Sequence, residues 1–101
     1  MLKLLIKPEA ENDLEKIYQY TFENWGIEQA EKYQDELYEG MQMISKRPNI
    51  GKVYPYSIEE YRKLHVNRHL IFYRFNAHKC EIIRILHDSM DIKMNLESSG
   101  T

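Results

Sequence analysis

The residues best suited to chemistry lie in the second half of this 101-residue chain. Between Tyr61 and His87, six lysines and arginines stand against a single acid, Glu81, and all four histidines of the chain fall in the same stretch. Histidine changes its charge near neutral pH, and arginine carries a fixed positive charge that suits carboxylates and phosphates. We therefore expect this half of the chain to face a polar or acidic partner.

No familiar catalytic or cofactor motif accompanies these residues. The sequence contains no phosphate-binding loop, HExxH, GxSxG or paired-cysteine zinc signature. The four histidines are spread over different predicted strands, and the single cysteine, Cys80, excludes a multi-cysteine zinc site. We predict neither a metal nor a cofactor. Four tyrosines among the basic residues could stack on nucleotides, although tyrosines more often fill cores: Tyr54, Tyr56, Tyr61 and Tyr73.

The first half of the chain has the opposite charge. Ten acids and two lysines lie between Glu9 and Glu39, although the net charge of the whole chain is only −2. The two halves could attract each other as solvated faces, or the basic half could be kept for a partner, and the sequence leaves both interpretations open.

The hydrophobic spacing predicts the elements that must position these residues. A short strand at 2–7 is ended by Pro8, and Gly26 separates two amphipathic helices that form an antiparallel hairpin. The first helix has an apolar stripe at Ala10, Leu14, Ile17, Tyr18, Thr21 and Trp25, and the second, over 28–46, has one at Ala30, Tyr33, Leu37, Met41 and Ile44. Three strands joined by short turns follow at 61–66, 69–75 and 80–86.

These elements predict an α+β fold in which the helix hairpin covers one face of a sheet made by the first strand and a three-stranded antiparallel meander. The opposite face would then carry alternate strand residues, and Arg62, Arg74 and Arg84 are candidates for a concave basic surface there. The hydrophobic content of 43% and charged content of 30% exclude a disordered chain and a membrane span. We predict one domain over 1–96 and a flexible tail over 97–101. Nothing at the N-terminus resembles a signal peptide, so we expect the protein to be cytoplasmic.

Several segments together give the chain a family resemblance. They are RILHDSMD at 84–91, YRK at 61–63, HLIFY at 69–73, NIG at 49–51, AENDL at 10–14 and WG at 25–26. In their order and spacing, over residues 2 to 96, they resemble the ParE toxin family of the RelE/ParE toxin superfamily.

The resemblance implies the toxin of a bacterial type II toxin–antitoxin module that stabilises a plasmid or chromosome. Such toxins poison DNA gyrase, block replication and arrest growth, and a ParD-like antitoxin neutralises them. The antitoxin would carry the contact with operator DNA, so the toxin would meet that DNA only indirectly. No residue of the toxin needs to be catalytic. The residues expected to contact the target are Arg62, Tyr73, Arg74, Arg84, His87, Met90 and Asp91.

Two alternatives accompany this interpretation. The related RelE proteins are ribosome-dependent, metal-independent messenger ribonucleases, and here Arg62 and Arg84 could neutralise the phosphate while His87 acts as acid or base. The sequence lacks the lysine cluster and C-terminal tyrosine usual in that branch, and acids follow His87. A degenerate, non-toxic member that acts only in operon autoregulation is the second alternative.

Each candidate residue also has a structural interpretation. Arg62 and Arg84 could pair with Glu60, Glu81 or Asp91 across neighbouring strands. His87 could end its strand and hydrogen-bond Asp91, and Met90 and Met94 could pack on the helices.

Overall fold

A computed structural model describes residues 1–55 and 59–97 of the chain. Along the sequence its elements are β1 (Lys3–Ile6), α1 (Pro8–Trp25), α2 (Ile27–Lys46), β2 (Lys52–Val53), β3 (Arg62–Val66), β4 (His69–Phe75), β5 (Lys79–His87) and α3 (Ile92–Glu97). The predicted order of strand, helix, helix and meander is confirmed, with β2 and α3 as additions. Of the predicted tail, residues 98–101 lie outside the described part of the chain.

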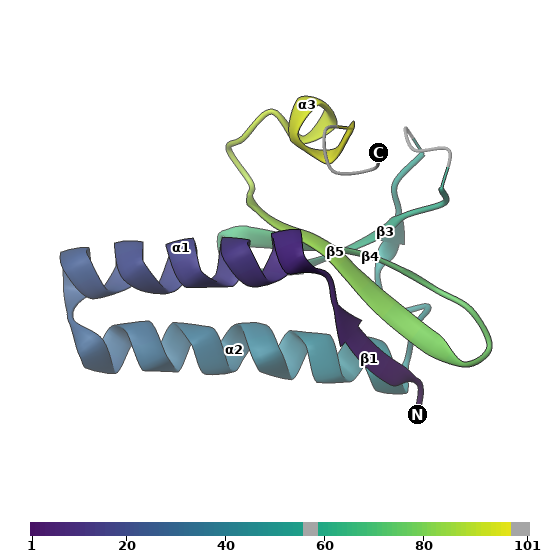
Figure 1. The fold of residues 1–101 in the computed structure, drawn as a ribbon, viewed down its shortest axis with the longest axis horizontal. Coiled ribbons are helices and arrows are strands. Elements are labelled where there is room, and N and C mark those ends of the chain that lie inside the picture. Colours follow the sequence, from purple (N-terminus) through teal and green to yellow (C-terminus); the bar gives the residue numbers. More distant parts are fainter. Residues whose placement is uncertain (56–58, 98–101) are drawn as a thin grey trace.

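Pro8 and Gly26 set the start of the helix hairpin and the turn between its two helices. Pro8 occupies the first turn of α1, where its missing N–H costs nothing. Gly26 separates α1 from α2 at φ 91°, a conformation that favours glycine, and its N–H donates to the Phe22 carbonyl. The two helices run antiparallel side by side (Figure 1).

The sheet has five strands in the order β1-β5-β4-β3-β2. The meander β3-β4-β5 is antiparallel, β2 extends it antiparallel at one edge, and β1 joins the other edge parallel to β5. A bulge in β5 opposite Phe72 and Tyr73 shifts the register, so that Tyr73 pairs with Ile82 and Phe72 with Arg84.

Hydrophobic side chains cover both faces of the sheet. The main core joins the hairpin to one face, and its fully buried members include Leu37, Met41, Ile44, Ile71 and Tyr73. A second cluster occupies the opposite face, where α3 brings Leu96 against Tyr54, Tyr61, Phe72, Ile83 and Leu86. The face expected to be concave and basic is therefore largely apolar and carries a helix. Arg62 does not share that face, because it pairs with Tyr73, whose side chain lies in the main core.

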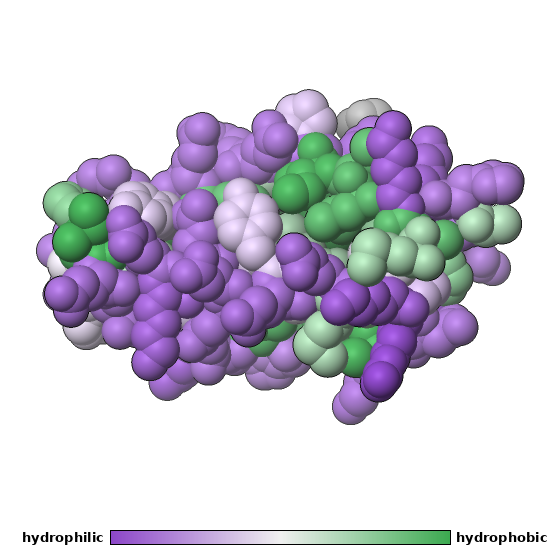
Figure 2. Space-filling model, turned by 90° about the horizontal axis from the view of Figure 1, so that it is seen from below, coloured by the Kyte–Doolittle hydropathy of each residue, from purple (hydrophilic) through white to green (hydrophobic). Residues whose placement is uncertain are grey.

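The hairpin extends beyond the sheet (Figure 1). Its tip exposes Phe22, Trp25 and Ile27, and Figure 2 shows a hydrophobic patch at that end of an otherwise hydrophilic helix surface. Trp25 was predicted to lie on the packed stripe of α1, but it is 64% exposed because no strand reaches it.

Candidate target-binding site

Arg84 lies in a buried ion pair that joins three elements. Its guanidinium contacts the Asp13 carboxylate of α1 through two hydrogen bonds, Nε to Oδ2 at 2.7 Å and Nη2 to Oδ1 at 3.0 Å. Its Nη1 donates to the Asn95 carbonyl of α3 at 3.2 Å. The hydrogen bond with Asp13 raises the pKa of Arg84. The acid in this ion pair is therefore Asp13, and not Glu60, Glu81 or Asp91, which the structural interpretation of Arg84 offered.

Asp13 is present at this point because β5 becomes an edge strand there. β1 pairs with β5 only as far as Ile82, so the later N–H groups of β5 lack a strand neighbour on that side. The Asp13 carboxylate accepts the Ile85 N–H at 2.9 Å and supplies the missing partner. The Asp13 carboxylate therefore accepts hydrogen bonds from both the Ile85 N–H at the sheet edge and the buried Arg84 guanidinium.

Arg62 and Tyr73 hold the segment between α2 and β2. The Tyr73 hydroxyl accepts the Gly51 N–H at 2.9 Å and donates to the Pro48 carbonyl at 2.7 Å, and Arg62 Nη1 donates to the Gly51 carbonyl at 2.8 Å. Tyr73 is fully buried, and this burial raises the pKa of its hydroxyl. Gly51 is required at this close approach, since a Cβ there would lie 2.5 Å from the Tyr73 hydroxyl.

Arg74 is engaged with a neighbour on β5. Its Nε donates to Glu81 Oε1 at 3.2 Å, and Lys7 Nζ lies 3.7 Å from the other carboxylate oxygen. Burial opposes the charged form of Glu81, but the Arg74 hydrogen bond and the nearby cations outweigh it and lower the Glu81 pKa. Much of the positive charge at Arg74 is therefore balanced within the molecule.

His87, Met90 and Asp91 form the accessible part of the predicted contact set. His87 Nδ1 accepts the Ser89 N–H at 3.1 Å and lies 2.7 Å from the Ser89 hydroxyl, whereas a bond to Asp91 was expected. Asp91 instead accepts the Met94 N–H at the start of α3. Met90 is 41% exposed and Met94 67%, so neither packs fully on the helices.

A groove opens beside His87, between the projecting half of the hairpin and the ends of β4 and β5. Its volume is about 630 Å³, and we call it the hairpin groove. Its lining residues are Lys16, Ile17, Tyr20, Thr21, Trp25, Gln29, Tyr33, Arg68, His69 and His87.

Two histidines stand together in the hairpin groove. His69 and His87 are paired across β4 and β5, and their rings are 5.2 Å apart and nearly perpendicular. The Tyr33 hydroxyl lies 2.5 Å from His69 Nδ1 and also accepts the Arg68 N–H. Burial, followed by the repulsion of His87, lowers the pKa of His69 to about 4. His69 is therefore uncharged at neutral pH and acts as a polar member of a mostly apolar floor.

Sequence reasoning pointed to His87 but missed its neighbours His69, Tyr33 and Arg68. The short turn between the last two predicted strands gave only a partial signal, because its register would place His69 opposite Leu86, and the bulge in β5 shifts this pairing by one residue to His87. The helix residues of the groove were harder to find, since Tyr33 looked like an ordinary core position on its helix stripe.

The predicted contact residues thus occupy separate places. Arg62, Tyr73 and Arg74 lie towards one end of the meander, and His87, Met90 and Asp91 lie at the other, with Arg84 in its ion pair between them. Their role in binding a target stays a prediction. Within the described ranges, no three His, Cys, Asp or Glu side chains are grouped as a metal ion would require. No helix of those ranges is long and apolar enough to cross a membrane.

Comparison with known proteins relates the sequence of this chain to toxins. Residues 4–92 match the family model described as the ParE toxin of the type II toxin–antitoxin system parDE. Toxin ParE1 of Mycobacterium tuberculosis is 35% identical over 95 residues, covering 93% of this chain and 97% of the relative. Toxin ParE1 of Caulobacter vibrioides is 37% identical over 87 residues, covering 86% and 90%.

A solved structure shows the same fold. It is described as the chromosomal ParDE TA system from P. aeruginosa, and its matching chain superposes with a TM-score of 0.75 at 24% identity. The match covers 86% of this chain and 96% of that one.

Proposed function

Because this chain belongs to the ParE toxin family of type II toxin–antitoxin systems, we propose that it inhibits DNA gyrase and blocks replication. The observation that carries the proposal is the family match over residues 4–92, together with relatives matched along nearly their whole length. This activity belongs in the cytoplasm, where gyrase works on the chromosome. It needs no catalytic group on the toxin, because gyrase itself cleaves the DNA.

The surface proposed to meet gyrase is the accessible segment from His87 to Asp91. It combines an imidazole, an exposed methionine and two carboxylates at the end of β5, beside the hairpin groove. An exposed methionine surrounded by polar groups suits a protein contact, because its flexible thioether adapts to a partner's surface. Arg84 supports this surface from within through its hydrogen bond to α3, whereas Arg62 and Tyr73 hold the 48–51 segment at the other end of the meander.

A ParD-like antitoxin is the proposed neutralising partner. The hairpin groove offers an apolar floor between two helices, with Lys16 and Arg68 among its lining residues. An antitoxin segment that folds on binding could place apolar side chains on this floor and acids beside the two cations. The antitoxin's own DNA-binding part would then repress the operon.

The geometry gives the ribonuclease alternative less support. That mechanism needs Arg62, Arg84 and His87 around one phosphate, whereas Arg62 is hydrogen-bonded to Gly51 and Arg84 is paired with Asp13. His87 Nδ1 lies 3.4 Å from Asp88 Oδ1, and a carboxylate so close to the imidazole would repel a phosphate bound there.

The test is a gyrase supercoiling reaction with purified toxin, ATP and relaxed plasmid. We expect loss of supercoiling and accumulation of cleaved plasmid, and addition of the antitoxin should reverse both. Supercoiling that proceeds normally with folded toxin would contradict the proposal. Cleavage of messenger RNA in a translation reaction would then identify the ribonuclease alternative, and normal growth on expression alone would identify the non-toxic one.

A matched pair of variants locates the contact surface. Met90 on the proposed surface and Met43 on the outer face of α2 are similarly exposed, at 41% and 47%. Met90→Glu should raise the toxin concentration needed for inhibition at least tenfold, since it puts a charge into a protein contact. Met43→Glu should leave inhibition unchanged. Equal effects of the two substitutions would place the contact elsewhere.

A further inference from the structure

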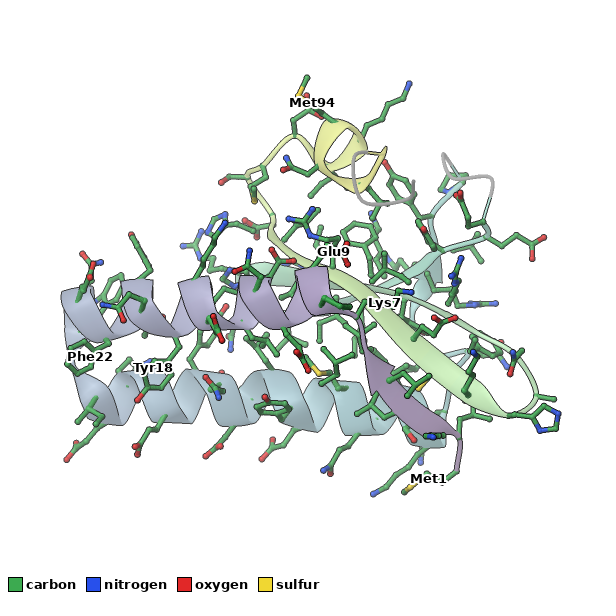
Figure 3. The ribbon with its side chains drawn as sticks, viewed as in Figure 1. Met1, Lys7, Glu9, Tyr18, Phe22 and Met94 are labelled. Atoms are coloured by element: carbon green, nitrogen blue, oxygen red, sulfur yellow. The ribbon has the colours of Figure 1, made fainter. Side chains whose placement is uncertain are left out.

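Five basic residues gather at the end of the molecule opposite the hairpin tip. We call this the basic end; it consists of Lys3, Lys46, Arg47, His78 and Lys79. Figure 1 shows that the N-terminus, the start of β1 and the last turn of α2 lie at the same end, and Figure 3 marks it by Met1. All five side chains are exposed except that of Lys79, which is half-buried.

Backbone hydrogen bonds fix the positions of these residues in the chain relative to one another. Lys3 pairs with Lys79 across β1 and β5, and the Lys3 N–H donates to the His78 carbonyl at 3.1 Å. The Leu2 N–H donates to the Ser45 carbonyl at 3.0 Å, which attaches β1 to the last turn of α2. The basic end is therefore a prearranged surface drawn from three distant parts of the sequence.

No acid accompanies these residues in their own segments. The sequence contains no Asp or Glu before Glu9, between Gly40 and Ile58, or between Tyr61 and Cys80. The nearest acid on β5, Glu81, forms its ion pairs with Arg74 and Lys7, and Lys79 is also close enough to lower the Glu81 pKa. Among residues 1–55 and 59–97, none of the five basic residues takes part in an ion pair.

Structural needs explain only part of this arrangement. Lys46 and Arg47 suit the negative end of the α2 dipole. Lys3 lies at the start of β1, His78 in the turn before β5 and Lys79 at the start of β5, where no helix dipole favours a positive charge. Like charges directly opposite each other on neighbouring strands are unfavourable, so the Lys3–Lys79 pair costs stability when nothing neutralises it. An anionic partner would remove that cost.

We infer that the basic end binds the phosphate backbone of duplex DNA directly. The choice of DNA over an acidic protein rests on the proposed function, which takes the toxin to an enzyme that holds DNA. Duplex DNA carries about one negative charge per 1.7 Å of its axis, so a few fixed cations can meet several phosphates at once. No base-reading side chain is involved, and the binding is independent of sequence.

The charge distribution orients the toxin on this partner. The net charge of −2 gives no overall attraction, and the acids Glu28, Glu31, Asp35, Glu36 and Glu39 gather along α2. DNA would therefore attract one end of the molecule and repel the other. Tyr33 in the hairpin groove and Lys46 are thirteen residues apart on α2, roughly 20 Å at the helical rise, so the groove stays open when DNA is bound.

The experiment is fluorescence anisotropy of a labelled 25-base-pair duplex with purified toxin, without gyrase, between about 50 and 200 mM salt. We expect Lys46→Glu/Arg47→Glu to weaken binding more than tenfold at low salt. The slope of log K against log salt should become shallower by about 0.9 for each phosphate that the variant no longer neutralises. Lys3→Gln/Lys79→Gln, which alters the other two elements with neutral residues, should also weaken binding.

The matched control is Lys32→Glu/Lys93→Glu, which changes the net charge by the same amount at exposed positions far from the basic end. Its affinity should stay within about twofold of the unaltered toxin. An equal loss in the control, or no binding by the unaltered toxin, would overturn the inference. So would competition by polyglutamate as effective as that by unlabelled duplex, which would indicate an acidic protein partner. Because the binding experiment contains no gyrase, it tests the DNA contact separately from the supercoiling reaction. Either the DNA contact or the inhibition of gyrase can therefore be disproved while the other stands.

Discussion

At the scale of single residues, the Asp13–Arg84 pair shows how a candidate contact residue can be structural. The two side chains are only 9% and 16% exposed, and the carboxylate serves both the guanidinium and the Ile85 N–H. A buried charge that loses its partner is strongly unfavourable. The position of Arg84 therefore depends on a residue at the other end of the sequence.

Asp13→Asn should lower the free energy of unfolding by about 3–5 kcal/mol, because it leaves the Arg84 guanidinium buried without a counter-charge. Urea unfolding at neutral pH would measure the change. Glu11→Gln, an exposed charge on the same helix turn, should change stability by less than about 0.5 kcal/mol. A double variant, Asp13→Asn/Arg84→Met, should be more stable than Asp13→Asn alone. An unchanged urea midpoint in Asp13→Asn would show that the pair contributes nothing.

At the scale of elements, α3 is attached to the sheet by few contacts. It has six residues, and it is held to the sheet by the buried side chain of Leu96, the partly buried Ile92 and the Arg84 hydrogen bond to Asn95. So short a helix cannot be stable alone, so α3 should open and close without unfolding of the core. This opening would expose the second hydrophobic cluster.

Leu96→Ala should speed tryptic cleavage after Lys93 at least fivefold, since losing about 1 kcal/mol of packing raises the open population by that factor. The global urea midpoint should change little. Met94→Ala is the control, because Met94 points away from the sheet and is 67% exposed (Figure 3). Equal cleavage rates in the two variants would contradict a helix held by Leu96.

The elements were predictable from sequence to the extent that their signals are local. Pro8, Gly26 and the helix stripes mark the hairpin, and the short turns mark the meander. Neither β2, with two residues, nor α3, with six, is long enough to show a hydrophobic periodicity in the sequence.

The contacts of the site join residues that are far apart in the sequence, so no local pattern predicts them. Asp13 and Arg84 are separated by 71 positions, and in sequence Asp13 is one of ten acids in a helical stretch. The parallel pairing of β1 with β5 creates the edge that Asp13 completes, and nothing local signals that pairing.

At the scale of the whole molecule, His69 links stability to pH. Its pKa of about 4 in the folded protein lies below the ordinary 6.5, so between these values the unfolded chain binds the proton more readily. The contribution of His69 to stability is therefore complete above about pH 6.5 and is lost as the pH falls towards 4.

We expect about 2 kcal/mol less stability from this source at pH 4.5 than at pH 7.5, a value reduced for the partial exposure of the ring. Urea unfolding at the two pH values should show a smaller difference in His69→Gln, which cannot take up the proton. His65→Gln, at an exposed position on β3, should retain most of the original difference. The same pH dependence in all three proteins would mean that His69 does not titrate between folded and unfolded states.

The parallel pairing of β1 with β5 also sets an order for synthesis on the ribosome. The residues of β1 are made 76 positions before their partners on β5, Lys79–Ile82. The contacts between α1 and α2 are local and can form early, whereas the sheet forms only after β4 and β5 have been made. Until β5 has been made, the chain contains a helix hairpin and a β1 segment without its partner strand. A toxin of this fold therefore acquires its sheet, and with it the hairpin groove, only after β5 has been made.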